Sequence, residues 1–145
     1  MPSNHETFFR LARFGVVGHS KVKPFPLITY RRLKALGKSV HAIDPSTDQI
    51  DGDRAYPDLA ALPGPIDALI IETPKAETRD WVNAAAEAGI RDVWVHQGLE
   101  TPEAVTVAET RGINLRTGSC AVMYLDPGLS VHGLHKLIMK LTGRY

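Results

Sequence analysis

Short apolar runs alternate with longer amphipathic stretches along most of this chain. Each run is brief and continuous rather than alternating, which is typical of strands buried on both faces of a sheet. The five predicted strands cover residues 14–17, 40–43, 68–71, 93–95 and 113–115. Strands separated by helices favour an α/β fold, here a Rossmann-like open parallel five-stranded sheet with helices on both faces and right-handed crossovers.

Three stretches between these runs have the apolar spacing of helices. They cover residues 26–36, 76–88 and 101–111. Each is followed closely by a glycine, which commonly caps helix C-termini. The first is expected to place Leu27, Tyr30, Leu33 and Leu36 near one face of the helix. Thr101 supplies an N-cap for the third, and Pro102 suits its first position.

Two segments depart from this alternation. Residues 45–65 are rich in Asp, Pro and Gly, so we expect a loop with a short helix near residues 59–62 instead of a full crossover helix. Near the C-terminus, apolar residues recur at helical spacing and predict a helix over about residues 132–142, packed on the domain or on another subunit. With 145 residues, the chain is expected to form a single domain, residues 1–145, with its core at about 12–125.

The composition of the chain argues against binding to nucleic acids or membranes. The chain is 43% hydrophobic with a net charge of +1, so no strong field favours nucleic acid or a membrane surface. No window reaches the length of a membrane span, and no secretory signal is evident. A lone Cys120 permits no internal disulfide, which fits a reducing compartment. We expect a cytoplasmic protein that binds neither nucleic acid nor membranes.

Basic charge gathers near the first predicted strand. Residues 10–38 hold eight basic side chains and no acid. In an open parallel sheet, ligands bind beyond the carboxyl ends of the strands, where the first loop is Gly18-His19-Ser20-Lys21. Gly18 would let a ligand approach the backbone, Ser20 offers a hydroxyl, and Lys21 adds positive charge for a phosphate.

The glycine motifs of two common nucleotide-binding loops are missing. The chain has neither G-x-G-x-x-G nor G-x-x-x-x-G-K-[ST] after the first strand. However, Asp44 ends the second strand 26 residues after Gly18, roughly where an acid binds the ribose hydroxyls of NAD. An NAD(P)-dependent or other nucleotide-using enzyme, with Asp44 at the ribose and His96 handling protons, therefore stays open.

Several segments together carry a resemblance to a known family. They are VVGHS, VHAIDP, YPDLAALPGPIDALII, VWVHQGL and GSC, in this order. Over about residues 12–125 the chain resembles the CoA-binding domain family, the stand-alone relatives of the N-terminal domain of the succinyl-CoA synthetase alpha subunit. The resemblance implies a Rossmann-type sheet with CoA or an acyl-CoA lying across its loops.

The resemblance also implies which loop meets which part of the ligand. The first loop would meet the phosphates, Pro45 would border the adenosine, residues 73–74 would line the centre, and residues 97–98 would flank the pantetheine. The predicted ligand-binding residues are Gly18, His19, Ser20, Lys21, Asp44, Pro45, Thr73, Pro74, Gln97, Gly98 and Cys120. The family commonly has Asn before the second-strand proline and a basic residue after it, whereas this chain has Asp44 and Ser46.

Two hypotheses follow. The first is a non-catalytic module that senses or carries CoA or an acyl-CoA, acting through a partner or as a homo-oligomer joined by the C-terminal helix. The second is the nucleotide-using enzyme described above. We predict no catalytic residue for the first and no metal site, because His132 and His135 lack a third ligand.

Overall fold

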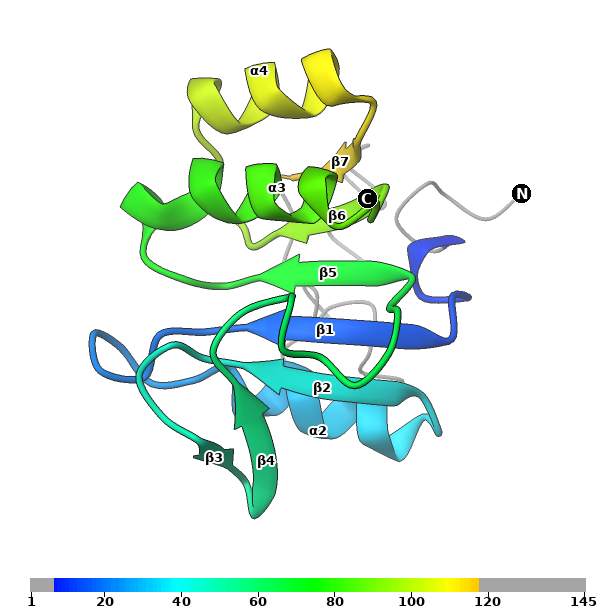
Figure 1. Ribbon diagram of the computed structural model, residues 1–145, viewed down its shortest axis with the longest axis vertical. Helices are drawn as coiled ribbons and strands as arrows, with labels where there is room; N and C mark the ends of the chain where they lie inside the picture. The colour runs from blue at the N-terminus through cyan, green and yellow to red at the C-terminus, as the bar shows by residue number, and fades with distance from the viewer. Residues whose placement is uncertain (1–6, 118–145) are drawn as a thin grey trace, which may run out of the picture.

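A mixed seven-stranded sheet forms the centre of the protein. The computed structural model describes residues 7–117, and the strand order is β3-β4-β2-β1-β5-β6-β7 (Figure 1). The strands are β1 Arg13–Val17, β2 Ser39–Ile43, β3 Gln49–Ile50, β4 Asp53–Tyr56, β5 Ala68–Ile71, β6 Asp92–Val95 and β7 Asn114–Arg116. The helices are α2 Leu27–Ala35, η1 Lys75–Glu77, α3 Thr78–Glu87 and α4 Pro102–Arg111. Cys120 and the predicted helix at 132–142 lie outside the described residues.

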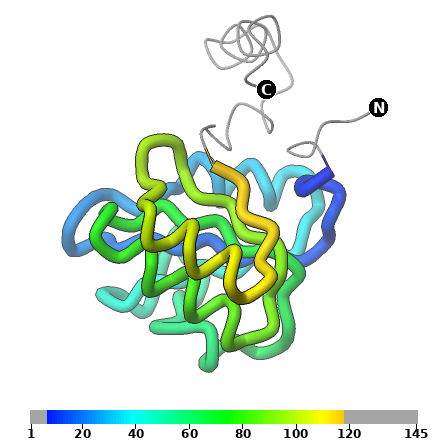
Figure 2. Tube along the Cα trace, turned by 90° about the horizontal axis from the view of Figure 1, so that it is seen from above, coloured from blue at the N-terminus to red at the C-terminus, as the bar shows by residue number. Residues whose placement is uncertain are grey.

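The five predicted strands are β1, β2, β5, β6 and β7, and they pair in parallel. Successive residues of a strand point to opposite faces, and the two faces have separate cores. Val16 packs with Tyr30 and Leu33 of α2, whereas Val17 packs with Val82 of α3. Figure 2 shows α2 and the α3–α4 pair on opposite sides of the sheet. This confirms the Rossmann-like α/β fold with both faces covered.

The strand count is corrected from five to seven, because residues 45–65 form more than a loop. β3 and β4 make an antiparallel hairpin whose turn, Asp51 and Gly52, has positive φ at both residues. The predicted short helix near residues 59–62 is absent. The chain makes a turn there, with Leu62 N 3.3 Å from Leu59 O. The side chains of Leu59 and Leu62 pack against the core below α3, so this segment covers the sheet without a helix.

The hairpin leaves part of β2 open. β4 pairs with β2 only at Ala42 and Ile43, and in Figure 1 it turns away from β2 beyond that point. Within the described part of the chain, the first half of β2, Ser39 to His41, therefore has a sheet neighbour only on its β1 side. A cavity of about 320 Å³ lies beside this edge, and its lining includes Lys34, Lys38 and Arg54.

The helix ends follow the sequence signals closely. Thr101 caps α4, accepting a hydrogen bond from the Ala104 N–H at 3.1 Å, and Gly112 ends the helix with φ 72°. One prediction for α2 is wrong, because Leu36 lies past the end of the helix and is 55% exposed. None of the helices among residues 7–117 has the length and apolar character that a membrane crossing requires.

Candidate functional site

Four loops meet at the edge of the sheet where the parallel strands end. After β1 the chain runs outward through β2 and β4, then returns to the opposite side of β1 as β5. This change of direction is the point at which open α/β sheets bind ligands. In Figure 1 it lies at the arrowheads of β1 and β5. The structure brings together the predicted loops that begin at Gly18, Asp44, Thr73 and His96.

Asp44 ties the first two of these loops together. Its side chain is fully buried. Oδ2 accepts a hydrogen bond from the Ser20 N–H at 2.9 Å, while Oδ1 accepts from Ser46 N at 2.8 Å and Ser46 Oγ at 2.6 Å. Burial acts to raise the pKa of Asp44, but the hydrogen bonds from Ser46 and Ser20 outweigh it and hold the pKa below 3.8.

The burial and hydrogen bonds of Asp44 argue against its binding the ribose of NAD. A ribose hydroxyl would need an exposed carboxylate oxygen, whereas both oxygens of Asp44 are buried and already hydrogen-bonded. Ser46 Oγ also accepts from Lys21 N at 3.0 Å, which extends the same network into the first loop. The geometry therefore favours Asp44 as a clamp between the loops after β1 and β2.

The backbone N–H groups of the loop after β1 form hydrogen bonds within the protein. Gly18 N bonds to Ile43 O, and the N–H groups of Val22 and Lys23 both bond to His19 O. With the Ser20 and Lys21 donors already bound to Asp44 and Ser46, an anion at this loop would be met mainly by side chains.

Gly18 has a packing explanation. A Cβ at this position would lie 2.6 Å from Cδ2 of Phe25 and 2.8 Å from Cδ of Pro26. Both distances are far below van der Waals contact, so a side chain would force this turn apart. The close approach of the following turn requires glycine here, even without a ligand.

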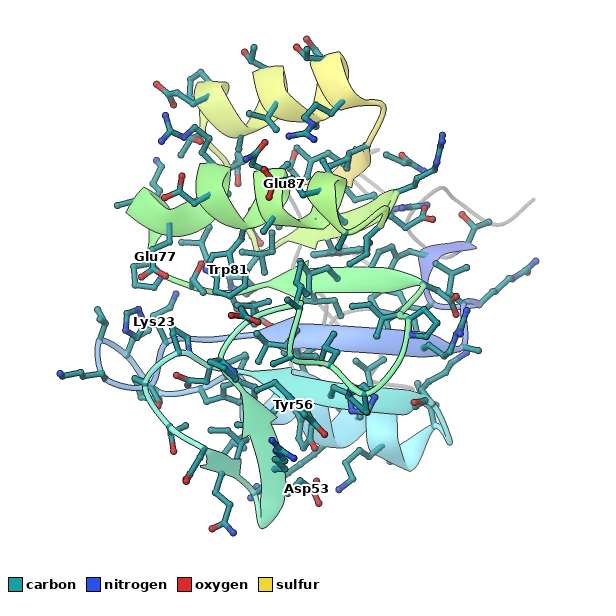
Figure 3. All side chains as sticks on the ribbon, in the orientation of Figure 1. Lys23, Asp53, Tyr56, Glu77, Trp81 and Glu87 are labelled. Carbon is teal, nitrogen blue, oxygen red and sulfur yellow. The ribbon has the colours of Figure 1, made fainter. Side chains whose placement is uncertain are left out.

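Unpaired positive charge marks this edge. Among residues 7–117, no carboxylate forms an ion pair with Lys21, Lys23 or Lys75. Figure 3 shows Lys23 at the same edge as Glu77 and Trp81. A cleft of about 310 Å³ opens beside Lys75 and reaches Thr101, at the start of α4. Of the three lysines only Lys75 lines this cleft, together with Arg79 and Glu103. Cations without a carboxylate partner attract anionic groups such as phosphates.

His19 connects two loops across the site. Its Nδ1 lies 2.7 Å from Glu77 Oε2. The other oxygen, Glu77 Oε1, accepts a hydrogen bond from the indole N–H of Trp81 at 3.3 Å. The loop after β1 is thus joined to the first turn of α3 as well as to the loop after β2.

Glu72 is a residue that sequence reasoning missed. It follows the last residue of β5, and its side chain is only 12% exposed. Oε2 accepts a hydrogen bond from Thr29 Oγ1 at 2.8 Å, and Oε1 lies 3.2 Å from His96 Nδ1. Burial raises the pKa of Glu72 above 4.5, outweighing the opposing effects of His96 and of the Thr29 hydrogen bond. An acid directly after a fully apolar strand was the available sequence signal.

The raised pKa predicts how Glu72→Gln behaves. A group whose pKa is higher in the folded state than in the unfolded state stabilises the fold at low pH and loses that contribution as pH rises. We therefore expect Glu72→Gln to unfold at higher urea concentration than the wild type at pH 7. The difference should shrink toward pH 4, where Glu72 is protonated. Urea unfolding at both pH values measures this, and a variant that is less stable at pH 7 would contradict it.

The remaining predicted residues lie at the same edge with different accessibility. Thr73 is fully buried, and its Oγ1 has no hydrogen-bond partner among the described residues. Pro74 directly precedes η1. Gln97 and Gly98 are exposed, and Gly98 has φ 85°. Pro45 is exposed beside the buried Asp44.

Comparison with known proteins identifies a matching family model and solved structures with the same fold. A family model described as a CoA binding domain matches residues 13–126. A conserved hypothetical protein from Pyrococcus furiosus superposes with a TM-score of 0.68 at 26% identity, covering 77% of this chain and 97% of its own. A hypothetical protein from Pyrococcus horikoshii OT3 gives 0.72 at 23% identity, covering 82% and 84%. No curated protein matches the chain.

A larger enzyme contains the same fold. The dinucleotide forming acetyl-coenzyme A synthetase 1 of Ca. Korarchaeum cryptofilum superposes with a TM-score of 0.60 at 21% identity. The match covers 78% of this chain but only 27% of the synthetase. At this identity the likeness shows the fold alone.

Proposed function

This chain belongs to the CoA binding domain family, and we propose from that premise that it binds CoA or an acyl-CoA at the carboxyl edge of its sheet. The observation that carries the proposal is the set of unpaired lysines, Lys21, Lys23 and Lys75, around the meeting point of four loops. CoA carries several phosphate charges, and charge-assisted contacts from ammonium groups are the strong ones. Family membership supports CoA binding in general.

The proposed contacts follow from what is exposed. The ammonium groups of Lys21 and Lys23 contact the phosphates, and the Ser20 hydroxyl joins them by giving up its 3.0 Å hydrogen bond to Ser46 Oγ. The adenosine lies against Pro45. The pantetheine then passes Pro74 and reaches Gln97 and Gly98. Among the buried members of the predicted set, Asp44 joins the loops after β1 and β2, Gly18 allows the close packing of Phe25 and Pro26, and Thr73 lies beneath the ligand. His19 joins its loop to Glu77.

We propose that the physiological role is to carry or sense CoA or an acyl-CoA as one CoA-binding domain over residues 1–145. Oligomerisation through residues 132–142 and a contact from Cys120 stay predictions, because both lie outside the described residues. The NAD alternative gains no support from the buried, fully bonded Asp44.

Thermal unfolding with a set of ligands tests the proposal. We expect CoA and acetyl-CoA to raise the melting temperature, and NAD, NADP and ATP to raise it less or not at all. A ligand at one hundred times its dissociation constant stabilises the folded state by about 2.7 kcal/mol. For a domain of this size that is a shift of several degrees, roughly 5–10 °C. A shift with NAD alone, or with none of the ligands, would overturn the proposal.

A further inference from the structure

The pair formed by the largely buried Glu72 and the partly exposed His96 is not used by any of the phosphate contacts proposed above. The two residues directly follow Ile71 and Val95, which are paired in the parallel register of β5 and β6. His96 N continues that ladder by bonding to Ile71 O at 3.0 Å. The pair is therefore fixed by the sheet at the point where a ligand would cross from one loop to the next.

The surroundings of Glu72 hold its carboxylate in one orientation. Thr29 of α2 binds Oε2, which leaves Oε1 directed at His96. The ammonium of Lys23, from the loop after β1, acts on the same carboxylate and favours its ionised form. Burying a carboxylate costs stability compared with an apolar residue of similar size. A largely buried carboxylate at the ligand-binding edge of a sheet is typical of functional sites.

His96 presents its other ring nitrogen outward. Nδ1 is buried and lies 3.2 Å from Glu72 Oε1 without forming a hydrogen bond with any described residue, whereas Nε2 is not among the buried unpartnered atoms. The imidazole is 31% exposed, and no side-chain hydrogen bond to Nε2 is found among residues 7–117. A carboxylate within ion-pair distance of one imidazole nitrogen, with the other nitrogen free for a ligand, suits a general base, whose hydrogen bonds often become well aligned only when the ligand binds.

We propose that His96, oriented by Glu72, accepts the proton of the CoA thiol, so that CoA is bound as its thiolate. This inference rests on the proposed function, in which Gln97 and Gly98, the two residues after His96, flank the pantetheine end. The S–H bond breaks, the proton adds to His96 Nε2, and the electron pair stays on sulfur. The ionised Glu72 stabilises the imidazolium that forms, and Thr29 keeps the carboxylate in place. The thiolate is the reactive form of a thiol, so the domain would hold CoA ready for acylation or disulfide exchange.

A pH titration of bound CoA tests this inference on the full chain. The ultraviolet absorbance of the thiolate is followed as a function of pH for the protein saturated with CoA. The same titration with desulfo-CoA, which lacks the thiol, gives the contribution of Cys120, and this is subtracted. We expect the thiol of bound CoA to ionise at least about one pH unit lower than in free CoA, a tenfold gain in thiolate below its pKa. His96→Gln should return the midpoint to that of free CoA, and Glu72→Gln should remove part of the shift.

His41→Gln is the matched control, because His41 lies on β2 beside Tyr56 and away from this pair. It should keep the full shift. The inference is overturned if bound CoA ionises like free CoA, or if His96→Gln keeps the shift. Stabilisation of the fold by CoA and desulfo-CoA is measured in parallel. Absence of that stabilisation would overturn the proposed function as well, whereas stabilisation with an unshifted thiol overturns this inference alone.

Discussion

Replacing Asp44 with alanine should lower the free energy of unfolding by about 3 kcal/mol, because it leaves two backbone N–H groups in a buried site without acceptors. These are the N–H groups of Ser20 and Ser46, and the Ser46 hydroxyl loses its acceptor as well. Urea unfolding at pH 7 measures the loss. Asp44→Asn should cost less, since its amide keeps one acceptor oxygen.

The same substitution should change the response to acid. The pKa of Asp44 is lowered in the folded protein, so its stabilising contribution is present above the unfolded pKa, near 3.8, and is lost as pH falls through the folded one. The alanine variant should lack this component of acid unfolding. Asp48→Ala is the matched control, because Asp48 is exposed in the same loop. Equal losses in Asp44→Ala and Asp48→Ala would rule out the clamp.

Lys21→Glu should weaken CoA binding about 30-fold. A hydrogen bond between charged groups contributes about 1.5–3 kcal/mol, and about 2 kcal/mol corresponds to this factor. The side chain of Lys21 is exposed and has no ion pair among the described residues, so little stability should be lost with it. Isothermal titration with CoA at fixed salt measures the affinity, and unfolding in urea measures the stability.

Arg91→Glu is the matched control for this charge reversal. Arg91 is exposed and immediately precedes β6, so it lies at the opposite edge of the sheet. It makes the same change in net charge and should leave the affinity almost unchanged. A similar loss in both variants would mean that the overall field of the protein, and not a contact at Lys21, governs binding.

Much of the fold could be predicted because its signals are local. The strands buried on both faces are continuous apolar runs, and glycines and Thr101 mark the helix ends. The β3–β4 hairpin was missed because its strands are short and polar, although Asp51-Gly52 is a common hairpin turn. The Asp51-Gly52 pair between two short segments is the sequence signal of this hairpin.

The site was harder to predict because its interactions join distant segments. The position of Asp44 was identified, but its partner Ser20 lies 24 residues away, and only the folded chain shows the two in contact. The need for glycine at position 18 comes from Phe25, whose ring direction no pattern reveals. Glu72 and His96 are likewise 24 positions apart in sequence and become neighbours only through the β5–β6 register.

The partly open edge of β2 has a consequence for how this protein behaves at high concentration. An unpaired strand edge can accept a strand from another molecule and so begin aggregation, and proteins commonly guard such edges with lysine. Here Lys34, Lys38 and Arg54 line the cavity beside Ser39 to His41. A foreign strand approaching this edge would have to displace or bury these cations and Asp53, which also lines the cavity and forms an ion pair with Lys34. We therefore expect these charged residues to oppose self-association through the open edge of β2.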